Sequence, residues 1–136
     1  FNTMLRLFKE RDSLNIVSDQ IGAPTYAPHL AKATVEVLSK ADFVSGVYHL
    51  CGAGEISWYE FAQEILQHAQ LYESAIQCNA VYPIPSSAYP TPAKRPLNSR
   101  LDCSKAKKIL GVSLPDWHEG LAACIKEKYG NKNLRH

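Results

Sequence analysis

Side chains that could bind an anionic ligand are concentrated in one proline-rich segment, residues 89–102. Its three prolines exclude a regular helix, because proline lacks an amide donor and favours extended geometry in the residue before it. Arg95 can hold a phosphate or carboxylate through two parallel hydrogen bonds, although a solvated surface cation is an equal alternative. Tyr89 could stack on a nucleobase or pack against the loop itself. The segment is therefore a candidate rigid wall for an anion.

A second polar loop, residues 19–25, carries Asp19, Gln20 and Thr25. These side chains could face a ligand. Asp and Thr also commonly accept hydrogen bonds from the amides of their own turns. From the residues alone, the turn interpretation is favoured for Asp19 and Thr25.

The usual catalytic and cofactor signatures are missing from the sequence. There is no Tyr-x-x-x-Lys pair, no Gly-x-Ser-x-Gly elbow and no Walker loop. The Gly52-Ala-Gly54 pair precedes a predicted helix, but Ser57 stands where a dinucleotide fingerprint needs its third glycine. The histidines and the four cysteines lack metal-ligand spacing. We therefore expect no catalytic, cofactor-binding or metal site within this chain.

Charge is distributed unevenly along the 136 residues. Residues 1–88 contain five Lys or Arg and nine Asp or Glu, a net charge of −4, whereas residues 89–136 contain ten and four, a net charge of +6. The basic third could attract phosphate, or could be a solvated face with a basic tail. It lacks the interleaved aromatics of nucleic-acid binders, so no such partner is expected.

Targeting signals are also missing from the sequence. No apolar run approaches the roughly 20 residues of a membrane helix, and no signal peptide is present. We therefore expect a cytoplasmic protein with reduced thiols and no membrane partner.

The strongest local signal for secondary structure is a capping box at Ser57 and Glu60, which predicts a helix with an apolar stripe from Trp58 to Ala69. Periodicity and turn residues predict the remaining elements. Together they give an α+β fold with four or five helices and about three short strands, as one domain over residues 1–129 and a frayed tail at 130–136. Helices are expected near residues 1–11, 28–38, 58–69, 102–110 and 116–129, and strands at 14–18, 47–51 and 76–84.

Several motifs taken in order resemble dTDP-4-dehydrorhamnose reductase, an extended short-chain dehydrogenase/reductase. The resemblance covers that family's C-terminal, substrate-binding half and nearly the whole of this chain. The motifs are Asp19-Gln-x-Gly-x-Pro-Thr25, Gly46-Val-Tyr-His-Leu50, Ser57-Trp-Tyr-Glu-Phe61, residues 88–102 and Leu114-Pro-Asp-Trp117.

The resemblance implies a parent enzyme that reduces the 4-keto group of dTDP-4-dehydro-L-rhamnose to give dTDP-L-rhamnose. Its Rossmann domain would hold NADPH or NADH and the Tyr/Lys pair. We expect that domain to be missing here because the resemblance covers only the C-terminal half, in agreement with a start at Phe1. The fragment alone is expected to be inactive and to bind no cofactor. Its partners would be the dTDP-sugar and the Rossmann domain, and the exposed interdomain face could promote self-association. The substrate-binding residues would be Arg95, Tyr89, Gln20, Thr25 and Asn98.

Two further points follow from the resemblance. A regulatory subunit of methionine adenosyltransferase, which would act through protein interaction, is similar in this half, although Leu114-Pro-Asp-Trp117 favours the reductase. Some relatives use acidic residues in magnesium-bridged dimer contacts, whereas this chain carries His29 after Pro28 at the matching place. This difference argues against the magnesium-bridged arrangement and leaves open whether the parent forms such a dimer.

Overall fold

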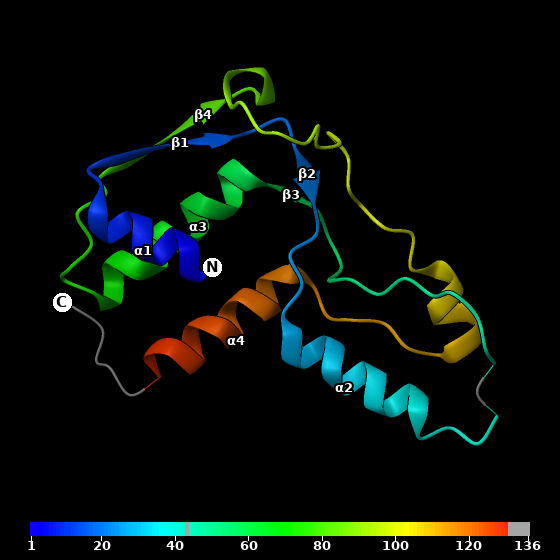
Figure 1. The fold of residues 1–136 in the computed structure, drawn as a ribbon. Helices are drawn as coiled ribbons and strands as arrows, with labels where there is room; N and C mark the ends of the chain where they lie inside the picture. The colour runs from blue at the N-terminus through cyan, green and yellow to red at the C-terminus, as the bar shows by residue number, and fades with distance from the viewer. Residues whose placement is uncertain (43, 131–136) are drawn as a thin grey trace.

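A parallel pair of strands forms the larger of two small sheets in the computed structural model, which describes residues 1–42 and 44–130. Strand β1 (Ser13–Val17) pairs with β4 (Ala80–Ile84), in a register that sets Leu14 opposite Val81. Helices α1 (Asn2–Glu10) and α3 (Trp58–Tyr72) pack against each other and against this pair (Figure 1).

The remaining elements extend from this centre. Strands β2 (Ile21–Gly22) and β3 (Ile56–Ser57) form a short antiparallel ladder. Helix α2 (Ala27–Leu38) lies at the far end of the molecule from β1 and β4, and α4 (Trp117–Tyr129) lies between (Figure 1). A 3₁₀ turn η1 (Ser86–Ala88) follows β4, and a π-helical segment η2 (Ala106–Leu110) precedes α4. The predicted α+β class is confirmed.

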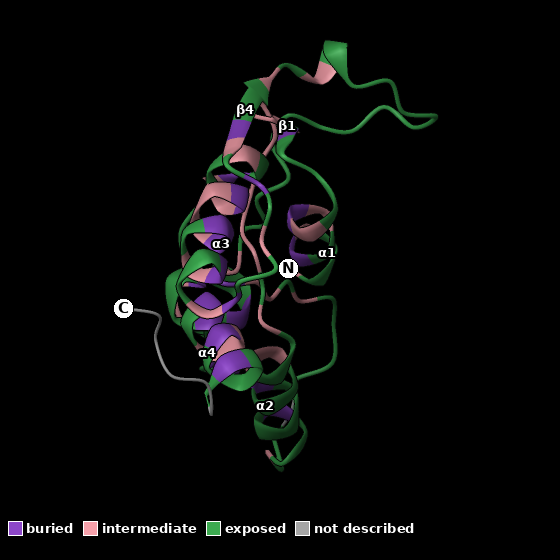
Figure 2. Cartoon of the chain, turned by 90° about the vertical axis from the view of Figure 1, so that its left-hand side faces the viewer, coloured by how far each residue is buried: buried purple, intermediate pink, exposed green. Residues whose placement is uncertain are grey.

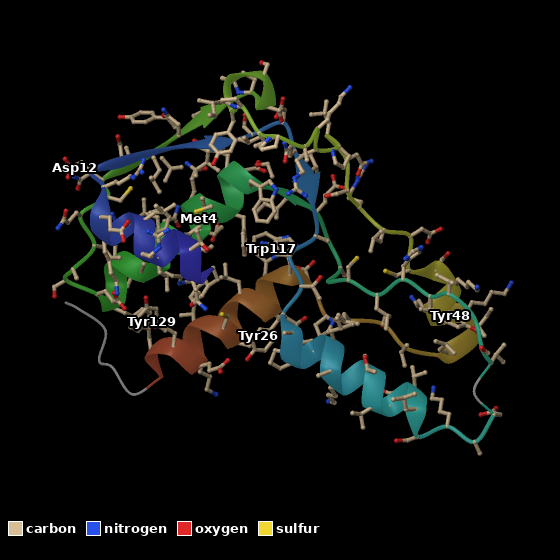
Figure 3. The ribbon with its side chains drawn as sticks, viewed as in Figure 1. Met4, Asp12, Tyr26, Tyr48, Trp117 and Tyr129 are labelled. Atoms are coloured by element: carbon tan, nitrogen blue, oxygen red, sulfur yellow. The ribbon has the colours of Figure 1, made fainter. Side chains whose placement is uncertain are left out.

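The main hydrophobic core joins α1, α3, α4 and the parallel strands. Phe8 and Ile65 are fully buried in it, and Trp117 meets Phe61 edge to face with ring centroids 5.9 Å apart. The purple buried residues of Figure 2 follow the inner faces of α3 and α4, and Figure 3 shows Trp117 at the point where α4 begins. The apolar stripes predicted for these helices thus form one packed layer.

A smaller core cluster replaces the strand predicted at residues 47–51, and that prediction is wrong. Tyr48 and Leu50 pack on a buried set at the α2 and η2 end, comprising Val37, Ala106, Leu110 and Val112. The segment 47–51 carries no ladder partner among the described residues, so its apolar side chains are satisfied by packing alone. Figure 3 shows Tyr48 beside η2.

The predicted boundaries of the last two helices are confirmed in part. The helix expected from Asp102 begins only at Ser104 and is π-helical over η2, which has no side-chain cap, although Asp102 accepts a hydrogen bond from the Ser104 amide at 2.8 Å. Gly111 closes η2 in the left-handed conformation at φ 66°. Asp116 accepts from the His118 amide at 3.0 Å as the N-cap of α4. Of the predicted tail at 130–136, Gly130 bonds back to the Lys126 carbonyl, and residues 131–136 lie outside the described part.

Gly52 and Gly54 serve close backbone approaches, in keeping with their interpretation as turn residues. A Cβ at Gly52 would stand 2.4 Å from the Pro24 carbonyl oxygen. Gly54 has φ +82°, and a Cβ there would meet the Asp116 carboxylate at 2.7 Å. These contacts bring the start of α4 beside the turn before β3.

None of the described helices is long and apolar enough to cross a membrane. Within residues 1–42 and 44–130, no three His, Cys, Asp or Glu side chains gather in a way that could hold a metal ion.

The predicted capping box at the start of α3 is confirmed in full. Ser57 is buried, and its hydroxyl oxygen accepts from the Glu60 amide at 3.1 Å. The Glu60 carboxylate accepts in return from the Ser57 amide at 3.0 Å and from its hydroxyl at 2.7 Å. The Ser57 hydrogen bonds lower the pKa of Glu60, so the carboxylate stays ionised beside the positive end of the helix.

We predict that Ser57→Ala destabilises the chain by about 1 kcal/mol, the usual cost of losing an N-cap hydroxyl. Urea unfolding followed by circular dichroism measures this change. Ser57→Thr retains the hydroxyl and should recover most of the loss. Equal destabilisation by both substitutions would show that the hydrogen bonds of the cap contribute little.

Candidate functional site

A groove of about 720 Å³ lies between α1, β1, the start of α3 and the proline-rich segment. It is lined by three of the five predicted substrate-binding residues, Gln20, Tyr89 and Arg95, which come from segments about 70 positions apart. Met4 and Leu7 of α1 supply apolar side chains to the same groove. The arrangement combines an apolar wall with a cationic rim, as small-molecule sites often do.

The turn after β1 positions one end of the proline-rich segment. The Asp19 carboxylate accepts from the Ser86 amide at 2.9 Å and from the Ser86 hydroxyl at 2.6 Å. The Gln20 side-chain amide donates to the Ser86 hydroxyl oxygen at 2.9 Å. Asp19 therefore fixes η1 and, through it, the backbone at Tyr89, whose amide donates to the Ser86 carbonyl.

The other end of the segment is held by β2. The Ile21 amide donates to the Leu97 carbonyl at 2.8 Å, and the Ser99 amide donates to the Ile21 carbonyl at 2.9 Å. Asn98, which lies between them, forms an isolated parallel bridge with Ile21. Its side-chain oxygen accepts from the Arg100 amide and guanidinium, at 3.1 and 2.9 Å. Asn98 does not line the groove, and in this structure its side chain braces the loop.

Arg95 lies on the exposed stretch between these two anchors. Residues 87–102 are exposed throughout, and Figure 2 shows the green segment after β4 extending away from the body. Among the described residues, Arg95 and the other groove cation, Arg11, take part in no ion pair, whereas Arg100 pairs with Glu55. Two cations in one groove therefore keep their donors available for an anion.

Thr25 lies outside this groove, in the walls of two neighbouring cavities of about 350 and 500 Å³. Its hydroxyl oxygen accepts from the Gly52 amide at 3.0 Å and donates to the Ala23 carbonyl at 3.2 Å. The hydroxyl thus holds the close approach of Gly52 to Pro24. The structure does not bring Thr25 together with Arg95.

Trp58 is a site residue that the sequence reasoning assigned to the core. It is 53% exposed and lines the groove as well as both neighbouring cavities. The Trp58 backbone amide donates to the Gln20 carbonyl at 3.4 Å, so Trp58 lies beside the polar loop of residues 19–25. The missed signal was its place at the first position of α3, where a side chain lies at the edge of the helix stripe and not within it.

Comparisons with known proteins agree on the identity of the domain. The family described as RmlD substrate binding domain matches residues 1–129. A dTDP-4-dehydrorhamnose reductase from Burkholderia thailandensis is 42% identical over 134 residues, which cover 92% of this chain and 45% of the relative.

Solved structures give the same result. The dTDP-4-dehydrorhamnose reductases of Clostridium acetobutylicum and Bacillus anthracis, the latter in complex with NADP, superpose with TM-scores of 0.81 and 0.80 at 32% identity. Each alignment covers 93% of this chain and 42% of the solved one. The chain therefore spans less than half the length of the relatives it matches.

We predict that the Asp19 carboxyl titrates below its ordinary pKa of 3.8, because the Ser86 hydroxyl and amide donate to the ionised form. A folded-state pKa below the unfolded value stabilises the turn at neutral pH, and this stabilisation is lost as the pH falls through the lowered pKa. NMR titration of the Asp19 carboxyl carbon and of the Ser86 amide would follow this loss. Ser86→Ala should raise the Asp19 pKa toward 3.8.

Ser87→Ala is the matched control, because the exposed neighbour Ser87 makes no hydrogen bond to Asp19 among the described contacts. It should leave the Asp19 titration unchanged. A wild-type midpoint at or above 3.8 would show that the Asp19–Ser86 contact is not populated in solution.

Proposed function

We propose that this chain, which belongs to the RmlD substrate binding domain family, binds the nucleotide-sugar in an enzyme that reduces dTDP-4-dehydro-L-rhamnose to dTDP-L-rhamnose. The observation that carries the proposal is the convergence of Gln20, Tyr89 and Arg95 on one groove with an apolar wall. The names of the relatives support the choice of sugar nucleotide.

The groove offers a suitable group for each part of such a ligand. Arg95, with Arg11 of the same groove, would meet the diphosphate, since an unpaired guanidinium binds phosphate oxygens through charge-assisted hydrogen bonds. Tyr89 and Trp58 are 54% and 53% exposed, so either ring is free to stack on the base. Gln20 would stand at the groove wall, while Thr25 and Asn98 would act near it, through the loops that they hold.

The hydride would come from NADPH or NADH, held by residues outside this chain. The chain lacks the Tyr-x-x-x-Lys pair in its sequence, and we therefore propose that it does not catalyse the reduction alone. We treat residues 1–129 as one substrate-binding domain, in line with the extent of the family match. The cytoplasm is the proposed compartment, because four free cysteines suit a reducing environment.

Titration with dTDP-L-rhamnose tests the assignment. We predict millimolar binding, because only part of the cleft is present, with amide shifts confined to residues 19–25 and 86–100 in NMR spectra. Arg95→Gln should weaken binding about tenfold or more, the loss of a charge-assisted interaction of ~1.5 kcal/mol.

Arg6→Gln provides the matched control for that experiment. Arg6 has the same side chain and lies on α1, but it pairs with Glu10 at 2.8 Å and does not line the groove. Its substitution should leave the affinity unchanged. Equal weakening by both variants would reduce the role of Arg95 to general charge, and no response in the two loops at millimolar ligand would refute the groove as the site.

Exposed apolar side chains lead to a prediction about association. Val35 and Leu38 of α2 are 64% and 69% exposed, and Val47 is 75% exposed. Apolar surface of this kind tends to associate. We predict that sedimentation velocity will show concentration-dependent self-association, and that Leu38→Glu will reduce it. A single monomeric species at high concentration would contradict this prediction.

A further inference from the structure

Two cysteines distant in the sequence meet beside one of the cavities. The Sγ atoms of Cys51 and Cys103 lie 3.6 Å apart, although 52 positions separate the residues. Both side chains are half-buried. Of the other thiols, Cys78 is buried and directed at the Ala80 carbonyl, while Cys124 lies on α4. The fold thus places one specific pair of thiols in van der Waals contact.

The backbone around the pair can accommodate a covalent bond. A disulfide needs its sulfurs at about 2.05 Å, so the two atoms must approach by about 1.5 Å. Cys51 ends an extended segment without a ladder partner, and Cys103 lies in the irregular stretch before Ser104. Neither residue belongs to a helix or a sheet that would resist a small shift. No regular secondary structure at either residue therefore opposes the approach of the two sulfurs.

We propose that Cys51 and Cys103 are a modification site. Their thiols form a reversible disulfide with each other, and the oxidant is a low-molecular-weight disulfide such as glutathione disulfide. One thiol, as its thiolate, attacks the oxidant and releases one reduced thiol, which leaves a mixed disulfide on the protein. The other cysteine, as its thiolate, then attacks the protein sulfur of the mixed disulfide. This step closes the Cys51–Cys103 bond and releases a second reduced small thiol. Two protein thiols are oxidised and one small disulfide is reduced, so the electrons balance.

Burial determines how readily this site reacts. Desolvation raises the pKa of the Cys51 thiol, so little thiolate is present at neutral pH. The pair accordingly rests in the reduced form and reacts slowly, unlike an exposed thiol of low pKa.

The disulfide would stabilise the end of the domain that holds the smaller core cluster. The segment that ends at Cys51 carries Tyr48 and Leu50 of this cluster, and Cys103 lies three residues before η2, which supplies Ala106 and Leu110. A covalent bond between them closes a loop that spans 52 positions and removes freedom mainly from the unfolded chain. Cys51 also lines the cavity of about 350 Å³, together with Leu101.

The test exposes the chain to glutathione disulfide near pH 9, where the thiolate fraction is larger than at neutral pH, and maps the products by peptide mass spectrometry. We expect a cross-linked pair of peptides containing Cys51 and Cys103 and no lasting glutathione adduct on either residue. The oxidised form should melt roughly 5–15 °C higher than the reduced form. Dithiothreitol should reverse the shift.

Single substitutions separate a specific pair from general oxidation. Cys51→Ser and Cys103→Ser should each leave a stable glutathione adduct on the remaining partner and abolish the rise in melting temperature. Cys124→Ser, the matched control from a half-buried position, should behave as wild type. A stable adduct on wild-type Cys51 or Cys103, a cross-link that includes Cys124 instead, or failure of the thiols to react at all would overturn the proposal. These outcomes do not depend on whether the chain binds a nucleotide-sugar.

Discussion

The turn between β1 and β2 is the constraint on which the rest of the site depends. Four consecutive residues, Ser18–Ile21, each contact a distant segment. Ser18 donates to the Ile84 carbonyl of β4, and Asp19 accepts from the Ser86 amide. Gln20 accepts from the Trp58 amide at the start of α3, and Ile21 pairs with the loop around Asn98. Each of these contacts joins segments distant in sequence. Because they converge on one short turn, a shift there would move both ends of the proline-rich segment together.

This arrangement explains how an exposed loop can serve as a binding wall. Proline restricts the backbone of residues 90–96, and the hydrogen bonds at Ser86 and Ile21 hold the two ends. The side chain of Arg95 is therefore exposed on a segment whose backbone is held at both ends. A wall restrained in this way loses less conformational entropy on binding than a free loop would. The apolar side chains of α1 supply the complementary surface.

Local signals in the sequence were sufficient for the helices, because a capping box such as that at Ser57 and an apolar stripe need no distant partner. The strand predicted at 47–51 failed because the same apolar pattern can be satisfied by packing on η2. The two-residue strands β2 and β3 exist only through their mutual pairing, which no local pattern reports. That Gln20 and Arg95 line one groove could likewise not be predicted from their spacing in the sequence. Only the family resemblance suggested it. Exposure of Trp58 became evident from the structure alone.

The parallel pairing of β1 with β4 also constrains how the binding groove can form during folding. Leu14 and Val81 are partners across 67 positions. Their pairing must therefore offset the entropy lost in closing a long loop before it stabilises the fold. Helix α3 lies inside that loop and can form early from its own cap. The groove needs both β1 and the turn after β4, so it cannot form before these two distant segments have met. A ligand of the groove thus recognises only the folded domain, and it stabilises the native state by an amount that grows with the ratio of ligand concentration to Kd.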